Sequence, residues 1–200
     1  EKILNELSAG NNVQIDEFKD IEQDFILKLN LISIKPTMYI CNVDEESINK
    51  GNSFSKKVVE YAEKNNSSVV FVSASIEAQI AGLDNDDEKI EFLKELNLDE
   101  STLKKVIKTG YSLLNLINYF TCGPKETRSW TIYKNTCAPQ AAGKIHTDFE
   151  KGFIRAETVS FDDYVKYDGE SNSREAGKLR QEGKDYIVED GDVMNFLFNV

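Results

Sequence analysis

The sequence predicts an α/β domain that is followed by a compact α+β domain. Two short apolar runs, at 37–43 and 68–73, flank an amphipathic segment at 53–65. This order is typical of one parallel strand–helix–strand unit with a right-handed crossover. After about Leu116, short strand-like runs alternate with small helical segments. That change of pattern indicates a separate α+β domain over 117–200.

The elements of the first part follow from its apolar spacing. We expect helices at 1–9 and 20–31, a strand at 37–43, a helix at 53–65, a strand at 68–73 and a helical stretch at 84–110. The residues expected to face the core are Phe54, Val58, Val59, Tyr61, Ala62, Phe92, Leu93, Leu96, Leu98, Leu103, Val106 and Ile107. The acidic run at 84–88 lacks the central Gly and distal Glu of a calcium loop, so we interpret it as a solvated helix start.

The second part is predicted to contain short strands around two small helices. The strands are expected at 129–133, 154–159, 186–188 and 193–198, and the helices at 138–145 and 174–181. Gly residues within polar segments indicate turns at 182–184 and 190–192.

Composition and charge exclude several classes of protein. Of the 200 residues, 40% are hydrophobic, which is enough for a packed core. No apolar run approaches the roughly 18–20 residues that span a bilayer, and the first residues lack the pattern of a secretory signal. We therefore expect a cytoplasmic protein with no membrane partner. The net charge of −11 argues against binding to DNA through its phosphates.

Cysteine and histidine usage argues against a metal site. The three Cys show no Cys-x-x-Cys spacing, which indicates reduced thiols, and a single His leaves zinc without an ordinary ligand set. His146 and Asp148 invite interpretation as an acid–base dyad. Because no nucleophile is evident near them in the sequence, we favour a local structural role for His146 and expect no catalytic residue.

Polar and small residues follow both strands of the predicted parallel unit. Asn42 and Glu45 follow the first strand, and Ser73 and Ala74 follow the second. Ligands of α/β nucleotide-binding domains lie at the carboxyl ends of strands, where an Asn amide can face a purine edge. The alternative is that Asn42 and Glu45 only cap the following turn. Spacing alone leaves both interpretations open.

Longer segments resemble one protein family. They are the run Lys-Pro-Thr-Met-Tyr-Ile-Cys-Asn-Val-Asp-Glu at 35–45, the run Ser-Ala-Ser-Ile-Glu at 73–77, and the segments 119–132, 138–157 and 183–200. Together they closely resemble the Obg-like ATPases of the YchF group. The resemblance extends over essentially the whole chain, and the block 138–157 is long enough to be highly specific.

The resemblance implies a protein of three parts: a GTPase-like domain of the P-loop NTPase class, a coiled-coil helical insertion, and a TGS domain of the ubiquitin-like β-grasp fold. On this basis, residues 1–10 end the helical insertion. Residues 11–116 form the C-terminal part of the GTPase-like nucleotide-binding domain, and residues 117–200 form the TGS domain.

The same resemblance implies which residues bind the base. GTPases read guanine with an Asn-Lys-x-Asp loop, whereas the family has Asn-x-x-Glu, which Asn42 to Glu45 match, and prefers ATP to GTP. Asn42 is expected to contact the purine N7 side, and Val43 to reach the adenine amine through its backbone. Ser73 and Ala74 match the last base-contacting loop.

The phosphate-binding motif of such enzymes is missing from this sequence. A phosphate cradle needs Gly-x-x-x-x-Gly-Lys-Ser/Thr at a strand-to-helix turn, and the run at 51–57 has Lys but lacks the second Gly. The family's Mg²⁺-binding loops also lie upstream. We therefore expect a cut fragment that is inactive alone, from a parent that binds ATP and Mg²⁺ with its missing N-terminal part.

The resemblance also implies partners, because related TGS domains contact RNA or the ribosome. The candidate RNA-contacting residues are Lys125, Arg128, Lys144, Lys151 and Arg155, which otherwise form an ordinary solvated surface. We predict a fragment of a ribosome-associated ATPase that is linked to translation and redox state. The alternative is a stand-alone RNA-binding or protein-interaction module with a degenerate nucleotide half.

Overall fold

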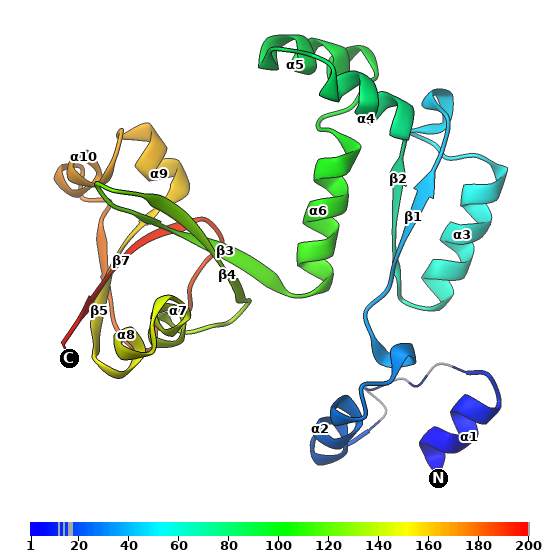
Figure 1. Cartoon of the computed structure of the whole chain (residues 1–200), viewed down its shortest axis with the longest axis horizontal. Coiled ribbons are helices and arrows are strands. Elements are labelled where there is room, and N and C mark those ends of the chain that lie inside the picture. Colours follow the sequence, from blue (N-terminus) through cyan, green and yellow to red (C-terminus); the bar gives the residue numbers. More distant parts are fainter. Residues whose placement is uncertain (12, 14, 16–17, 200) are drawn as a thin grey trace. The chain divides into compact units, whose positions relative to one another are not determined.

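The computed structural model describes residues 1–199 apart from 12, 14 and 16–17 (Figure 1). The chain divides into two compact units, Glu1–Val106 and Ile107–Val200, which are called the first and second unit below. The division falls within helix α6 (Thr102–Leu113). The three-part assignment at 1–10, 11–116 and 117–200 stays a prediction.

The first unit begins with two helices at the positions that the sequence predicts. Helix α1 is Lys2–Ser8 and helix α2 is Asp20–Lys28. Asn30 follows α2 with a φ of 50°, a left-handed conformation that Asn tolerates and that ends a helix. A short 3₁₀ helix, η2 at Ile32–Ile34, then precedes Pro36.

The predicted strand–helix–strand unit is confirmed. Strand β1 (Met38–Asn42) pairs in parallel with β2 (Ser68–Val72), from Met38 opposite Ser68 to Asn42 opposite Val72. Between them lie η3 (Glu45–Ser47) and α3 (Ser53–Lys64). Helices α4 (Ala74–Ala81) and α5 (Asp86–Glu95) follow, before α6.

Two predictions about the first unit are wrong. The single helical stretch at 84–110 is two helices, because Asn97 takes a left-handed φ of 54° between α5 and α6. Several residues expected in the core are exposed instead, since a sheet of two strands offers little surface to cover them; they are Phe54, Tyr61 and Leu103. Ile107, the first residue of the second unit, was also expected in the core and is exposed. The core that does form is centred on Val43, Ile48, Ile76 and Leu98.

The second unit is built on a five-stranded mixed sheet with the order β4-β3-β7-β5-β6. Its strands are β3 (Leu116–Cys122), β4 (Thr127–Tyr133), β5 (Phe153–Ser160), β6 (Arg180–Glu182) and β7 (Asp192–Phe198). Its helices are α7 (Ala138–Ile145), α8 (Thr147–Lys151), α9 (Phe161–Lys166) and α10 (Glu170–Glu175). The pair β3–β7 is parallel, and the other pairs are antiparallel.

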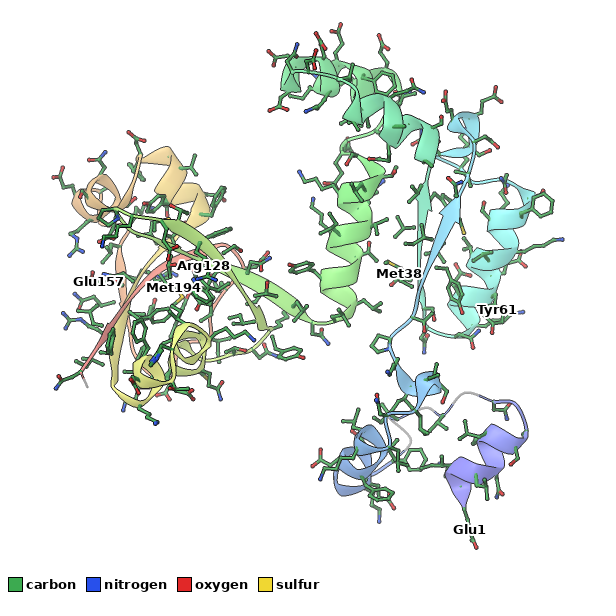
Figure 2. The ribbon with its side chains drawn as sticks, viewed as in Figure 1. Glu1, Met38, Tyr61, Arg128, Glu157 and Met194 are labelled. Atoms are coloured by element: carbon green, nitrogen blue, oxygen red, sulfur yellow. The ribbon has the colours of Figure 1, made fainter. Side chains whose placement is uncertain are left out.

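The core of the second unit lies between this sheet and α7. Ala138, Ala141 and Ala142 of α7 are buried completely, because small side chains let the helix approach the sheet closely. Tyr119 of β3 and Met194 of β7 belong to the same buried cluster as these alanines. Met194 is labelled in Figure 2. The buried Tyr119 hydroxyl donates a hydrogen bond of 2.8 Å to the carbonyl oxygen of Ala141.

Two predicted elements of the second unit are also wrong. The expected strand at 186–188 does not join the sheet. Instead, Ile187 bridges to Cys137, and the Val188 amide donates to the Thr136 carbonyl at 3.0 Å. The expected helix at 174–181 ends early, since Gly177 has a φ of +69°, and β6 follows it. Within the described part of the chain, no helix combines the length and apolar character that crossing a membrane requires.

Candidate functional site

The carboxyl ends of β1 and β2 bring the predicted base loops together. The two strands are parallel and in register up to Asn42 opposite Val72, so the loops that follow them leave the same edge of the sheet. The Val43 amide extends the ladder by donating to the Val72 carbonyl oxygen at 2.8 Å. Asn42 and Ala74 therefore meet, although 32 positions separate them in sequence.

The side chain of Asn42 links the two loops. Its Oδ1 accepts a hydrogen bond of 3.1 Å from the backbone amide of Ala74. A backbone amide can only donate, which identifies the accepting atom as the carboxamide oxygen. The side chain is exposed, so the group that it offers to a ligand is the Nδ2 donor.

The carboxylate of Glu45 is held by helix α4. Its Oε1 accepts hydrogen bonds from the Ser75 hydroxyl and, at 2.9 Å, from the Gln79 side-chain amide. Glu45, Ser75 and Gln79 are all exposed. The sequence pointed to Asn42 and Glu45 and to the backbone after the second strand, but it missed the side chains of Ser75 and Gln79 as partners of Glu45. Ser75 and Gln79 are four residues apart, a spacing that indicates a shared face only within a helix, and no helix was predicted over this segment.

The turn after β1 is capped by a different residue. Asp44 precedes η3, and its Oδ1 accepts the Ser47 amide at 2.8 Å. Its side-chain hydrogen bond with Ser47 is the main cause that lowers the pKa of the Asp44 carboxyl. The alternative in which Asn42 and Glu45 merely cap this turn is therefore not what the structure contains, since both side chains bond to α4 instead.

Three other predicted base-site residues offer only backbone atoms or a methyl group. Val43 is 6% exposed and Ser73 is 1% exposed, so both side chains point into the first unit. The Ser73 hydroxyl is buried and has no hydrogen-bond partner among the residues that the structure describes. Ala74 is exposed, but its amide is used by Asn42. A base at this edge would meet the Ala74 methyl group and the Val43 main chain.

The structure does not gather the five predicted RNA-contacting residues into one cluster. Lys125 lies in the β3–β4 turn and Arg128 at the start of β4, whereas Lys144 and Lys151 lie in the last turns of α7 and α8, and Arg155 on β5. In Figure 1 the β3–β4 turn and the helices α7 and α8 are at separate parts of the second unit. The Arg128 guanidinium stacks over the Trp130 ring at 4.5 Å, so part of its surface is already covered.

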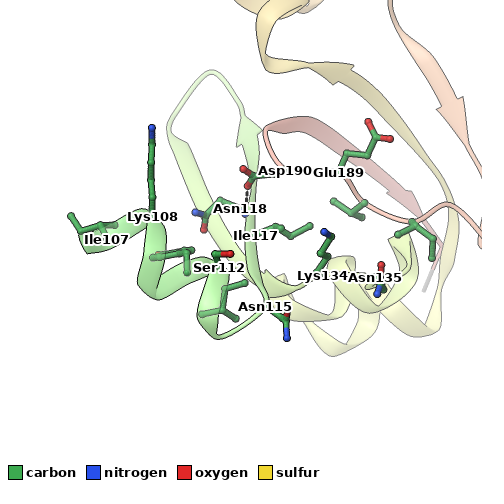
Figure 3. Close-up of a pocket in the computed structure, with 14 residues that line it drawn as sticks. Ile107, Lys108, Ser112, Asn115, Ile117, Asn118, Lys134, Asn135, Glu189 and Asp190 are labelled. Carbon is green, nitrogen blue, oxygen red and sulfur yellow. Dashed lines mark hydrogen bonds between the residues drawn. The ribbon is translucent and has the colours of Figure 1, made fainter. Parts of the chain in front are cut away.

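A cavity of about 750 Å³ lies in the second unit (Figure 3). Its walls include the apolar residues Ile107 and Ile187 beside the charged Lys134 and Asp190. The Asp190 carboxylate accepts the Asn118 amide at 2.8 Å, which engages its Oδ1 within the fold. None of the residues predicted to bind a base or RNA lines this cavity.

His146 contacts Asp148, whose Oδ2 lies 3.4 Å from its Nδ1, and its structural role stays a prediction. It ends α7 and begins α8, where its Nδ1 accepts the Asp148 amide at 3.2 Å. Among the residues that the structure describes, no three His, Cys, Asp or Glu side chains come together as metal ligands would.

Comparison with known proteins gives consistent matches along the chain. The family model YchF-GTPase_C, described as a protein of unknown function (DUF933), matches residues 116–199. The chain is 54% identical over 200 residues to the "Ribosome-binding ATPase YchF" of Escherichia coli O157:H7, covering all of this chain and 54% of that protein. It is 46% identical over 186 residues to the protein of the same name from Bacillus subtilis (strain 168), covering 92% and 50%.

Solved structures agree with these matches. The structure of the Schizosaccharomyces pombe YchF GTPase superposes with a TM-score of 0.75 at 39% identity, covering 90% of this chain and 48% of that one. A GTP-binding protein from Pyrococcus horikoshii OT3 superposes with a TM-score of 0.54 at 18% identity, covering 82% and 46%, which speaks for the fold alone. The fold is that of α/β nucleotide-binding proteins. The chain spans about half the length of the relatives that it matches.

Proposed function

The chain belongs to the YchF family, and we propose that it forms the base-recognising and ribosome-contacting part of an ATPase that prefers ATP to GTP. One observation carries this proposal: α4 holds both Asn42 and Glu45 at the carboxyl ends of two parallel strands. That edge is where α/β proteins bind nucleotides.

The chemistry of the two side chains supports recognition of a purine. The Asn42 Nδ2 group is a donor for N7, an acceptor that adenine and guanine share. Reading guanine by a carboxylate requires both of its oxygens, one for N1–H and one for the exocyclic amine. The Glu45 Oε1 already accepts from Ser75 and Gln79. We propose that guanine therefore gains no paired contact here, whereas the adenine amine reaches the Val43 backbone.

The phosphates and Mg²⁺ need other groups. We propose that residues outside this chain supply them, because the sequence contains no Gly-x-x-x-x-Gly-Lys-Ser/Thr run. Positioning and electrostatic stabilisation account for most of the catalysis of phosphoryl transfer. On this proposal the chain alone binds ATP weakly and does not hydrolyse it.

The second unit is proposed to be a TGS domain of β-grasp fold that contacts the ribosome. Its five-stranded mixed sheet packed on α7 supports the fold, and the names of the bacterial relatives support the partner. The two separate groups of cations, Lys125 with Arg128 and Lys144 with Lys151, are the proposed RNA contacts. A ribosomal partner implies the cytoplasm as the location.

Nucleotide titration tests the base site. We expect the full-length protein to bind a fluorescent ATP analogue more tightly than the GTP analogue, and this chain alone to bind either one weakly. Replacing Val43 by Lys and Glu45 by Asp, the Lys-x-Asp pattern of GTPases, should raise kcat/KM for GTP relative to ATP. The variant Asn172→Ala, at an exposed position of the second unit, is the control. An unchanged ratio would refute the assignment of the base loop.

Co-sedimentation with ribosomes at graded salt tests the partner. RNA contacts through Lys and Arg predict that association falls steeply as salt rises. Two double variants identify which group of cations makes the contact. One is Lys144→Ala with Lys151→Ala, and the other is Lys125→Ala with Arg128→Ala. Salt-sensitive ribosome binding by a full-length protein that binds no nucleotide would instead favour a stand-alone RNA-binding module.

A further inference from the structure

Helix α4 presents two donors to one carboxylate oxygen. Ser75 and Gln79 lie four residues apart and so occupy the same face of the helix. Both donate to Oε1 of Glu45, which is 30 and 34 positions away in sequence. Neither donor bonds to Oε2. The two oxygens of the Glu45 carboxylate are therefore not equivalent.

The position of α4 is fixed independently of this carboxylate. Ile76 is fully buried in the core of the first unit. On another face, Glu77 Oε1 accepts the Thr102 amide at 2.6 Å, the Thr102 hydroxyl at 2.6 Å and the Leu103 amide at 3.2 Å. These contacts anchor α4 to the start of α6, where a carboxylate also complements the helix dipole. Ser75 and Gln79 are thus presented by a helix whose place the core sets.

The same helix also orients the other base-site side chain. Its first residue, Ala74, donates its amide to Asn42 Oδ1. Helix α4 therefore orients both the amide group of Asn42 and the carboxylate of Glu45. A shift in either side chain would break a hydrogen bond to α4.

We propose that Ser75 and Gln79 are positioning residues that determine purine selectivity by occupying Oε1 of Glu45. This inference rests on the proposed function of the base loops. Guanine presents two adjacent donors on its Watson–Crick edge and needs both oxygens of a carboxylate, whereas adenine presents one exocyclic amine there. With both lone-pair sites of Oε1 used by Ser75 and Gln79, only Oε2 stays available. One oxygen cannot face two parallel donors as a pair of oxygens does, so the paired guanine contact is lost and adenine is not penalised.

The test compares nucleotide use by variants of the full-length protein. In Ser75→Ala with Gln79→Leu, Oε1 is released, and we expect the ratio of kcat/KM for ATP to that for GTP to fall by about tenfold. Ser75→Thr keeps a hydroxyl donor and should retain the ratio. Ala78→Ser changes an exposed residue of the same helix and is the matched control. The fold of each variant is checked by its melting temperature.

The outcomes separate this inference from the proposed function. If Asn42→Ala weakens nucleotide binding while the double variant keeps the wild-type ratio, the role of Ser75 and Gln79 is overturned and the base site stands. An equal loss for ATP and GTP would also overturn it, since that result reports only a structural role. If Asn42→Ala and Glu45→Ala both leave binding unchanged, the proposed function itself fails. Should the double variant misfold, Gln79→Leu alone must shift the ratio in the same direction.

Discussion

The five-stranded sheet of the second unit and the two-stranded sheet of the first are covered to different extents. In the second unit, Tyr119 and Ala141 are fully buried between the sheet and α7, and Met194 is 2% exposed. In the first unit, Ile40 of β1 is 52% exposed and Phe54 of α3 is 77% exposed. Two paired strands are marginal by themselves, whereas three or more strands with a covered face are independently stable.

The difference teaches that side-chain hydrogen bonds carry more of the connection between elements in the first unit. In the second unit they add to apolar packing, as the bond from the Tyr119 hydroxyl to the Ala141 carbonyl oxygen does. In the first unit they join distant segments, as Glu77 does for α4 and α6 and Glu45 does for α4 and the loop after β1. In the second unit, apolar packing already joins the elements, and a buried Asp192 accepts the Tyr186 hydroxyl at 2.7 Å beside that core. We therefore expect the second unit to fold alone and the first to be the less stable of the two.

The largest effect is expected from adding one methyl group to the second unit. A Cβ atom at Gly152 would overlap the backbone carbonyl of Asn199, whose amide donates to the Gly152 carbonyl at 2.9 Å. Because backbone atoms cannot rotate away, Gly152→Ala should lower the free energy of unfolding of the second unit by about 3 kcal/mol. Urea denaturation measures this loss.

Gly143→Ala is the matched comparison for that change. Its Cβ would meet the Glu150 side chain, which can move, so we expect a smaller loss. Backbone amides of the first unit should keep their hydrogen-exchange rates in both variants if the two units unfold separately. Equal stability of Gly152→Ala and the wild type would contradict the close approach of β7 to the α8–β5 turn.

The second prediction removes a polar link from the first unit. Glu77→Ala leaves the first amides of α6 and the buried Thr102 hydroxyl without their acceptor. We expect a loss of about 2 kcal/mol in the first unit, because hydrogen bonds to a charged group are stronger than neutral ones. Hydrogen exchange should quicken in α4 and at the start of α6 but not in β3 or β7. Glu91→Ala, at an exposed position of α5, is the control. If hydrogen exchange in Glu77→Ala quickens equally across both units, the two units do not differ in the way proposed.

The third prediction concerns alkaline pH in the second unit. Burial raises the pKa of Tyr119, and burial followed by the hydrogen bond to Asp192 raises the pKa of Tyr186. The ordinary value is about 10, so the stability that these groups contribute is fully present below pH 10. It is lost as the pH rises above 10 towards the folded-state values. We expect urea unfolding of the second unit to become easier over that range.

Tyr119→Phe sharpens this test. At neutral pH it should cost about 1 kcal/mol, because the buried Ala141 carbonyl loses its donor. Above pH 10 the variant should lose less stability than the wild type does. Tyr133→Phe, at a position 69% exposed, is the control. A wild-type pH profile in Tyr119→Phe would show that this hydroxyl does not govern the alkaline loss.

The sequence predicted individual helices and strands better than it predicted which residues pack against them. Apolar patterns predicted the strands β1 and β2 and the helix α3. The position of Asn42 and Glu45 after a strand made them candidates for the base site. Exposure of Phe54 was not predictable, because periodicity identifies an apolar face but not what covers it. The segment 186–188 has a strand-like composition, yet Ile187 finds its partner at Cys137 rather than in the sheet. The roles of Ser75 and Gln79 could not be predicted, because their shared acceptor, Glu45 Oε1, lies 30 and 34 positions away in the sequence.

The smallest effect is expected at the helix where the two units are divided. Gly110 lies inside α6, and a Cβ added there would meet no atom within 4 Å. Gly is less favourable than Ala in a helix interior, so Gly110→Ala should raise the free energy of unfolding by roughly 0.5–1 kcal/mol. If α6 frays between the units, the gain will appear as slower hydrogen exchange in α6 alone. If α6 couples them, exchange will slow in both units, and the two could no longer be treated as separate folding elements.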